Sequence, residues 1–226
     1  MIMRLMSLTV LATTLLLTGC GNDSAAGDYQ RPFKAIVAKL QGGPAAPTLA
    51  TLDQSGITTL RAALEADGQP IYLVVNPDLK YTNLMAPYGQ NGDVQTWASQ
   101  DYETMSLRAG MLVATRGFGA DLMSSTGPSV GQIAAGRGST QRRYHYLDGA
   151  DQPHQFDFAC ILAARGGDSV TVLGKSYATN KVTESCSGAS GSFVNEYWFD
   201  HGQNLRQSSQ MIAPGTNNLI LQRVID

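Results

Sequence analysis

The chain has 226 residues, of which 43% are hydrophobic, 15% charged and 8% aromatic. The low share of charged residues excludes a disordered or coiled-coil chain and indicates a domain with a buried core. The 16 Lys and Arg residues are balanced by 18 Asp and Glu residues, and no basic run exceeds Arg142-Arg143, so a nucleic-acid partner is excluded as well.

The first 19 residues have the pattern of a secretory signal peptide. Arg4 precedes an apolar run from Leu5 to Leu17, and no acidic residue occurs before Asp23. The run is too short to span a membrane, because a spanning helix takes about 20 apolar residues. We therefore predict that residues 1–19 are removed from the mature protein.

The predicted signal peptide ends in Leu17-Thr18-Gly19-Cys20, which resembles a bacterial lipobox. In a lipobox the Cys is acylated and becomes the first residue of the mature chain. Several acyl chains on Cys20 would hold the protein firmly on membrane lipid, since a single chain binds only marginally. Gly21 follows the Cys where Asp would favour the inner membrane, so we expect the outer membrane. Residues 20–30 are small and polar and are predicted to be a flexible tether.

Residues 31–226 are predicted to form a single domain, because the length fits one core. Two short helices are predicted at its start. Pro32–Leu40 has a Pro in its first turn, and Ser55–Ala66 has a Ser cap; both carry apolar residues at helical spacing. The segment Gln41–Ala50 between them is rich in Gly and Pro and is predicted to be a loop.

From Ile71 onward the hydrophobic pattern changes to the period of a strand. Turn sequences, among them Arg165–Asp168, separate strands at hairpin distance and leave no room for crossover helices. We therefore predict a mainly β domain with an antiparallel sheet, either barrel-like or a sandwich. Gly117–Gly138 is predicted to be a long loop. The ten predicted strands are Ile71–Val75, Val94–Ser99, Met111–Arg116, Arg142–Leu147, Gln155–Ala163, Ser169–Gly174, Lys181–Cys186, Phe193–Asp200, Leu205–Ile212 and Asn218–Ile225.

With Cys20 assigned to lipid, Cys160 and Cys186 remain as one pair. In an oxidising compartment they are predicted to form a disulfide, with two buried free thiols as the alternative. The cysteines and the three histidines lack the short spacings of zinc ligands. We expect no metal and no cofactor.

Three patterns resemble catalytic motifs, and each is better explained as structure. Gly127–Gly131 has the form of a nucleophile elbow around Ser129, but no buried strand precedes it and no long helix follows. Gly174-Lys175-Ser176 lacks the upstream glycine of a phosphate-binding loop, because Ser169 stands there. The acidic residues considered for glycoside hydrolysis have no spacing that brings two together; they are Asp148, Asp151, Asp157 and Glu184. No catalytic residue is predicted.

Aromatic side chains are a second candidate set, because such rings can stack on sugars. Tyr144 and Tyr146 share one face of a predicted strand, whereas Tyr197 and Trp198 point to opposite faces of another. Core packing is the alternative explanation, and it is the stronger one for Trp97 and Trp198.

Several motifs are similar to those of the YjbF/GfcB lipoproteins. The most specific is the run Leu107–Leu122, which contains Arg108, Arg116 and Asp121. The likeness covers most of the mature chain, with Leu205-Arg206 as a departure where an aromatic residue is expected before the arginine. The other matching positions are Cys20, Trp97-Ala98-Ser99 with Asp101, Cys160, Glu184-Ser185-Cys186, Tyr197-Trp198 with Asp200 and Gly202, and Ser208-Ser209-Gln210 followed by Pro214.

The resemblance implies a predominantly β domain on the periplasmic side of the outer membrane, active in production or export of an exopolysaccharide or group 4 capsule. It also implies a partner, since members are typically encoded beside a large outer-membrane β-barrel protein. It supplies no catalytic residues, so we expect a non-enzymatic accessory of polysaccharide secretion. A saccharide-processing enzyme and a polysaccharide-binding module are the alternatives.

Within the central run, Asp121 can bind backbone N–H groups of its own turn or pair with an arginine. A structural Arg–Asp pair is favoured over direct ligand contact, because ion pairs are commonly structural. The candidate contacts to a saccharide or partner are Trp97, Arg108, Arg116, Asp121, Tyr144, Tyr146, Tyr197 and Trp198.

Overall fold

The computed structural model describes residue 49 and residues 52–214 and 218–226. The predicted signal peptide, Cys20, the tether and the helix Pro32–Leu40 lie outside these residues. The described part contains twelve strands and two helices. In chain order they are α2 (Gln54–Asp67), β1 (Ile71–Asn76), β2 (Tyr81–Asn91), β3 (Val94–Ala98), β4 (Thr104–Arg108), β5 (Met111–Arg116), β6 (Ser124–Thr126), α3 (Val130–Ala134), β7 (Arg137–Leu147), β8 (Pro153–Val172), β9 (Lys175–Gly188), β10 (Gly191–Phe199), β11 (Leu205–Gln210) and β12 (Leu219–Ile225).

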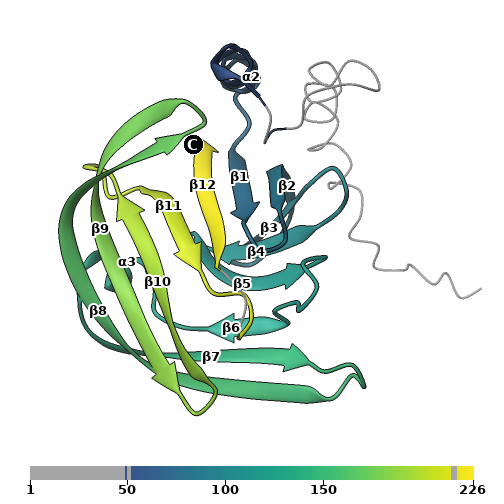
Figure 1. The fold of residues 1–226 in the computed structure, drawn as a ribbon, viewed down its shortest axis with the longest axis vertical. Helices are drawn as coiled ribbons and strands as arrows, with labels where there is room; N and C mark the ends of the chain where they lie inside the picture. Colours follow the sequence, from purple (N-terminus) through teal and green to yellow (C-terminus); the bar gives the residue numbers. More distant parts are fainter. Residues whose placement is uncertain (1–48, 50–51, 215–217) are drawn as a thin grey trace, which may run out of the picture.

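All twelve strands belong to one antiparallel sheet, in the order β5-β4-β3-β2-β1-β12-β11-β10-β9-β8-β7-β6. The sheet curls until its edges meet (Figure 1). There the Ser125 hydroxyl of β6 donates to the Leu112 carbonyl of β5 over 2.7 Å, and the Thr115 N–H donates to the Leu122 carbonyl over 2.9 Å. The prediction of a mainly β, antiparallel domain is confirmed, and of its two alternatives, a barrel-like sheet or a sandwich, the barrel-like sheet is what forms.

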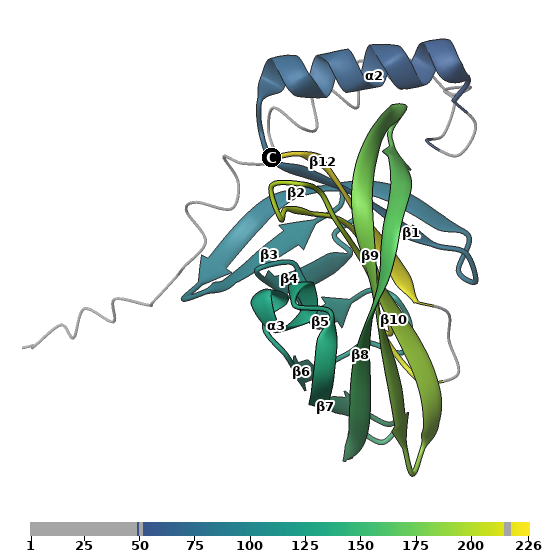
Figure 2. The same cartoon turned by 90° about the vertical axis from the view of Figure 1, so that its left-hand side faces the viewer.

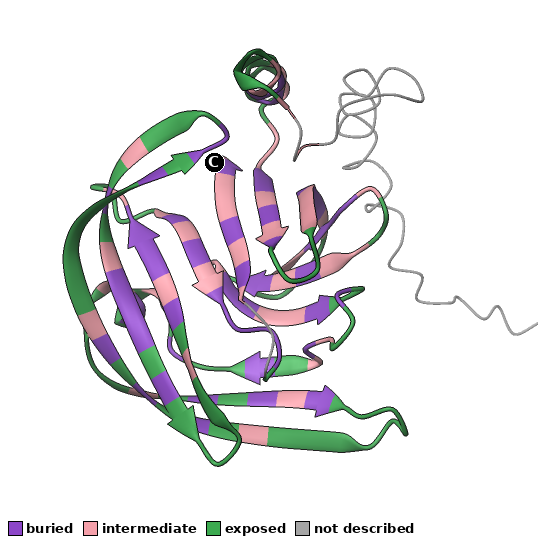
Figure 3. Cartoon of the chain, in the orientation of Figure 1, coloured by how far each residue is buried: buried purple, intermediate pink, exposed green. Residues whose placement is uncertain are grey.

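The main core fills the inside of this sheet, and the solvent side of the long strands β8 and β9 is exposed over much of their length (Figure 3). Rings from neighbouring strands meet edge to face. The centroids of Phe158 and Phe193 are 4.9 Å apart, and those of Tyr72 and Trp97 are 4.7 Å apart. Such pairs add about 0.5–1.5 kcal/mol to the stabilisation from burial.

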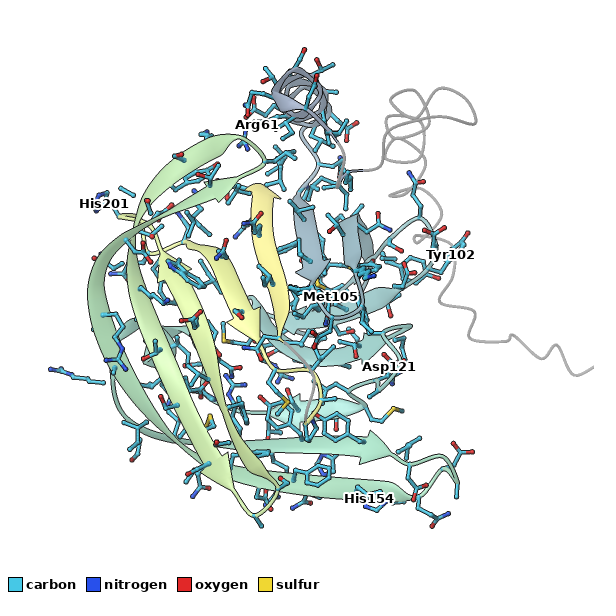
Figure 4. The ribbon with its side chains drawn as sticks, viewed as in Figure 1. Arg61, Tyr102, Met105, Asp121, His154 and His201 are labelled. Atoms are coloured by element: carbon cyan, nitrogen blue, oxygen red, sulfur yellow. A yellow bond between two sulfur atoms is a disulfide. The ribbon has the colours of Figure 1, made fainter. Side chains whose placement is uncertain are left out.

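A second core forms where α2 lies across one end of the sheet (Figure 2). Leu60 and Leu64 of the helix pack in the same cluster as Ile71 and Val224. Arg61 of the helix donates to the Val172 carbonyl over 2.7 Å and so ties α2 to the far end of β8 (Figure 4). A single face of the helix is thus buried, as its apolar spacing predicted.

The helix boundaries differ slightly from the prediction. Asp53, and not Ser55, is the N-cap, because its carboxylate accepts the Gly56 N–H over 2.7 Å. Gly68 ends the helix at a φ of 72°, where a residue without Cβ is favoured.

The strand prediction is wrong at several points. Arg165–Asp168 is not a turn: β8 continues through it with an irregularity between Ala164 and Gly166, so two predicted strands are one. Arg165 is the extra residue of this bulge, and Gly166 follows it at a φ of 89°. Gly117–Gly138 is not one loop, because it contains β6 and α3. The strands β2, β4 and β6 were not predicted.

Candidate functional site

A buried ionic network links β7, β9 and β10. Arg142 and Glu184 are 3% and 0% exposed, and the Arg142 Nε lies 2.8 Å from a Glu184 carboxylate oxygen. The same carboxylate accepts from Asn195 and from the Tyr197 hydroxyl, each over 3.0 Å. Arg142 also donates to the Tyr197 hydroxyl over 2.8 Å. Every charged atom named here has a partner, which is what makes a buried ion pair tolerable.

Burial and neighbouring side chains shift the pKa values of Arg142 and Tyr197 in this network. Desolvation opposes the charged form of Arg142, but the Tyr197, Tyr144 and Glu184 side chains around it raise the pKa of the guanidinium. Burial also raises the pKa of Tyr197 well above its ordinary value. Arg142 therefore stays charged and the Tyr197 phenol stays neutral near neutral pH.

The predicted disulfide is confirmed beside this network. The sulfur atoms of Cys160 and Cys186 are 2.02 Å apart. Glu184 and the two cysteines bring one potential ligand atom each within 4.8 Å of one another. The sulfur atoms are bound to each other, so in this state they are not thiolate ligands. His154 and His201 lie at opposite ends of the molecule (Figure 4).

The aromatic candidates are core residues. Tyr144, Tyr146, Tyr197 and Trp198 are at most 7% exposed. The Tyr146 hydroxyl donates to the Ile212 carbonyl over 2.8 Å, and the Trp198 Nε1–H donates to Asp168 over 2.8 Å. The hypothesis of an exposed stacking platform on these four rings is wrong, because each ring fills the interior and its polar atom is used there.

Asp121 organises the turn after β5. Its carboxylate accepts the Gly117 N–H over 2.8 Å and the Phe118 N–H over 3.0 Å. Arg116 donates to the carbonyl of Leu122 over 3.0 Å and not to Asp121. The favoured Arg–Asp pair is therefore wrong for this residue, and the alternative, a carboxylate that binds its own turn, is what forms.

The motifs that resemble catalytic sites have structural roles. Ser129 caps α3 in a capping box with Gln132. Gly174 lies in the turn between β8 and β9 at a φ of 80°. Three of the four acidic residues pair with separate side chains: Asp157 with Arg143, Asp148 with His154, and Glu184 with Arg142. Within the described chain these contacts bring no two carboxylates together.

Three hollows lie against candidate residues in the described part of the chain. A hollow of about 500 Å³ lies along β7 and β8, where Arg143 and Asp157 pair with each other. A second, of about 270 Å³, lies beside α3 and reaches the already paired Arg142. Neither contains an aromatic ring with an unused polar atom.

The third, which we call the mouth pocket, has a volume of about 260 Å³. It lies where β1 begins, β12 ends, and the β2–β3 and β4–β5 turns come together. The antiparallel register places Tyr72 opposite Arg223, and Gln95 opposite Leu107. Its lining consists of Pro70, Tyr72, Gln90, Asp93, Gln95, Trp97, Leu107, Ala109, Gly110, Arg223 and Asp226.

Two of the predicted candidates meet at the mouth pocket. Trp97 forms part of its wall, and its Nε1–H is buried without a hydrogen-bond partner among the described residues. Arg108 pairs with Asp93 of the rim over 2.7 Å. Burial raises the pKa of Tyr72, the other ring in the wall, and Arg223 opposes that rise. Trp97 and Arg108 were among the predicted contact residues, whereas Tyr72, Gln90, Gln95 and Arg223 were not, because their spacing resembles that of any half-buried strand.

A buried polar residue also joins two of the family-like motifs. Gln210 is 1% exposed; its Oε1 accepts the Leu112 N–H, and its Nε2 donates to the Gly110 carbonyl, both over 2.9 Å. This side chain holds the β4–β5 turn, and with it one side of the mouth pocket, against β11.

The fold and these sites define a class: a β domain on one nearly closed antiparallel sheet, crosslinked by a disulfide and built around a satisfied ionic network. Residues 33–224 match the family model described as group 4 capsule polysaccharide lipoprotein GfcB, YjbF. The chain belongs to this family of capsule polysaccharide lipoproteins, which confirms the resemblance found in the sequence.

The fold is similar to the crystal structure of the hypothetical lipoprotein YmcC from Escherichia coli (K12), with a TM-score of 0.62 and 16% identity, covering 77% of this chain and 98% of that one. A putative exported protein with a YmcC-like fold from Bacteroides fragilis matches at a TM-score of 0.34 and 8% identity, over 70% and 93% of the two chains. A search of curated protein sequences gives no match. Across the described ranges, neither helix has the length and apolarity needed to cross a bilayer.

Proposed function

We propose that this protein is a non-enzymatic accessory of exopolysaccharide or group 4 capsule secretion, anchored through acylated Cys20 at the periplasmic face of the outer membrane. Its proposed partner is an outer-membrane β-barrel secretion protein. The observation that carries the proposal is the family match, which spans residues 33–224.

The anchor is supported by the sequence around Cys20, where a short apolar run ends in a lipobox-like tetrapeptide. The disulfide between Cys160 and Cys186 supports a compartment outside the reducing cytoplasm. Together they favour a mature chain that starts at Cys20, with residues 20–30 as the tether and residues 31–226 as the domain.

The buried polar residues are bound to one another, and this favours an accessory role over catalysis. Glu184, the most buried carboxylate near an aromatic cluster, is held by Arg142, Asn195 and Tyr197. A general acid would need a raised pKa and access to substrate. At 0% exposure, Glu184 has no access.

The test combines a genetic and a biochemical arm. In a strain that lacks this gene, the wild-type chain is expected to restore surface polymer, and the Cys20→Ser variant, which cannot be acylated, is expected to restore little. A Cys160→Ala/Cys186→Ala chain controls for loss of folding without loss of the anchor. Crosslinking of intact membranes is expected to recover an outer-membrane barrel protein with the wild type. Full restoration by Cys20→Ser would overturn the anchor, and recovery of no barrel protein would overturn the partnership.

A further inference from the structure

We propose that one end of the sheet, which we call the acidic end, binds residues 31–40 of its own chain and is thereby turned toward the membrane. The contact itself rests on the described surface and on the sequence of the segment, whereas its relation to the membrane rests on the proposed function. The acidic end consists of the turns that follow β1, β3, β5 and β7, which are residues 77–80, 99–103, 117–123 and 148–152.

These four turns form one continuous surface, opposite the mouth pocket. Strands of an antiparallel sheet alternate in direction, so the turns after odd-numbered strands share an end. The Tyr81 hydroxyl donates to the Glu103 carboxylate over 3.3 Å, and a Cβ on Gly117 would lie 3.0 Å from Glu103 Cγ. The Met123 N–H donates to the His145 carbonyl over 2.9 Å. On the right-hand side of Figure 4 this end is marked by Tyr102, Asp121 and His154.

The acidic end carries the excess negative charge of the described chain. Its turns contain six carboxylates and one lysine, a formal charge of −5, whereas the rest of the described chain has eleven basic and ten acidic side chains. Such a one-sided charge favours a basic partner. The charged residues are Asp78, Asp101, Glu103, Asp121, Asp148 and Asp151, with Lys80.

Exposed apolar side chains stand among these carboxylates. Leu79 and Tyr102 are 49% and 61% exposed, and Leu147 at the end of β7 is 44% exposed. They are three of the five large apolar side chains that are exposed in the described part of the chain. The turn holds Tyr102 outward at a φ of 66°, and the buried Ser99 hydroxyl fixes this turn by accepting two of its backbone N–H groups. Apolar groups within a charged surround are typical of a surface that binds protein.

Residues 31–40, which lie outside the described residues, have the complementary chemistry. They contain three basic side chains, no acidic one, and four apolar side chains at helical spacing. The basic groups can pair with the carboxylates while the apolar groups cover Leu79 and Tyr102. The basic residues are Arg31, Lys34 and Lys39, and the apolar ones are Phe33, Ile36, Val37 and Leu40.

The segment is attached close enough to reach the acidic end of its own chain. Leu49 packs against the second core, to which Leu84 of β2 belongs. Leu84 is four residues from Lys80, roughly 13 Å along the strand. The nine steps from Leu40 to Leu49 can span roughly 30 Å. Because attachment gives a short segment a local concentration near millimolar, its own chain is favoured over a second copy.

The contact sets the orientation of the domain. The predicted tether, residues 20–30, leads from Cys20 directly into the segment. An acidic end that binds the segment is held close to the membrane, so the mouth pocket faces the periplasm. The three basic side chains also offset the repulsion between the carboxylates and anionic lipid headgroups.

Site-specific photocrosslinking in the full mature chain tests the contact. Benzoylphenylalanine replaces Tyr102 in one variant and Ile161, a 66% exposed residue of β8, in the matched control. We expect position 102 to crosslink to tryptic peptides of residues 31–40 at the mass of one chain. Its yield should exceed that of position 161 by about fivefold, because only position 102 lies where the attached segment binds.

Charge reversal tests the chemistry of the contact. Lys34→Glu/Lys39→Glu is expected to lower the yield at position 102 by about fivefold, because like charges then meet. Adding Asp78→Lys/Asp101→Lys is expected to restore about half of the lost yield, since opposite charges meet again. Unchanged urea unfolding midpoints show that the variants are folded. Equal yields at positions 102 and 161, crosslinks at the mass of two chains, or no rescue by the second pair would overturn the proposal.

The two proposals fail in different ways. If the contact is wrong and the proposed function is right, position 102 forms no crosslink to residues 31–40, while Cys20→Ser still fails to restore surface polymer. If the proposed function is wrong, Cys20→Ser restores polymer, and the crosslinks alone still decide whether the acidic end binds the segment.

Discussion

The buried network around Glu184 and the mouth pocket both set polar groups against aromatic rings, but they differ in where the partners come from. In the network, Arg142, Asn195 and Tyr197 surround the carboxylate and leave it no contact with solvent. At the mouth, the Trp97 N–H lacks an acceptor among the described residues. Polar groups satisfied inside the protein hold this fold together, whereas the rim of the mouth pocket carries an exposed ion pair that contributes little to stability.

The largest effect should come from breaking the network. Glu184→Gln removes the negative charge and leaves Arg142 buried without its counterion, so we expect a loss of about 3–5 kcal/mol in the free energy of unfolding. Equilibrium unfolding in urea measures it.

The matched control is Asp157→Asn. Asp157 also pairs with an arginine, Arg143 over 2.6 Å, but both side chains are more than half exposed. An exposed pair contributes about 0–1 kcal/mol. Equal losses in the two variants would mean that burial does not distinguish the network.

The disulfide should have the next largest effect. The bond joins residues 26 positions apart, for which the chain-entropy model gives about 3.5 kcal/mol. Replacing both Cys160 and Cys186 by Ala should lower the unfolding free energy by that order, and adding a reductant to the wild type should reproduce the loss. A reductant effect on the double variant itself would show that another thiol is responsible.

Gln210 links β11 to the β4–β5 turn at the mouth pocket, and its substitution should have an intermediate effect on the free energy of unfolding. Gln210→Leu keeps the volume but leaves the buried Leu112 N–H without its acceptor, at a cost of about 1–3 kcal/mol. Gln207→Leu is the control, since Gln207 bonds only the half-buried Gln222 side chain within the described residues. If Gln207→Leu destabilised the protein more, the link from β11 to the mouth would not contribute as we infer.

A substitution at the rim of the mouth pocket should hardly change the free energy of unfolding. Asp93→Asn breaks a pair in which Arg108 is 49% and Asp93 71% exposed, so we expect a loss below about 1 kcal/mol. Thermal unfolding of the variant and the wild type measures the loss. A loss as large as that of Glu184→Gln would show that the rim pair stabilises the fold as the buried network does.

The smallest effect should be a pH dependence from exposed carboxylates. The His154 side chain, and then the Gln152 and Ala150 N–H groups, lower the pKa of Asp148 to about 2. The folded state therefore binds this proton less readily than the unfolded chain, so the contribution is present above about pH 4 and is lost as the pH falls toward 2. Asp148→Asn should flatten the decline of the urea midpoint in that window. An unchanged slope would contradict the assignment.

Strong local patterns allowed much of the fold to be predicted. Met111–Arg116 is a strand with the predicted bounds, and α2 follows the apolar spacing of Ser55–Ala66. The strand β2 was missed because Pro87 and Gly89 interrupt its pattern, and the register shifts between them. Arg165–Asp168 looked like a turn because a glycine bulge and a tight turn use the same residue types.

The mouth pocket could not be predicted because no local pattern encodes it. Tyr72 and Arg223 are neighbours only through the pairing of β1 with β12. The lack of a partner for the Trp97 N–H depends on every side chain around it, so the sequence could nominate the residue but not its role.

The pairing of β1 with β12 also has a kinetic consequence. Val74 lies opposite Leu221, almost the whole domain away in the chain. Synthesis starts at the N-terminus, so one edge of β1 stays unpaired until β12 has been made. Pairing these two strands closes a loop of almost the whole domain, and so long a loop closes slowly because of its entropic cost. We therefore expect the sheet to close last at this seam. A chain cut before β12 should collapse and aggregate through the unpaired edge of β1 rather than form a smaller stable domain.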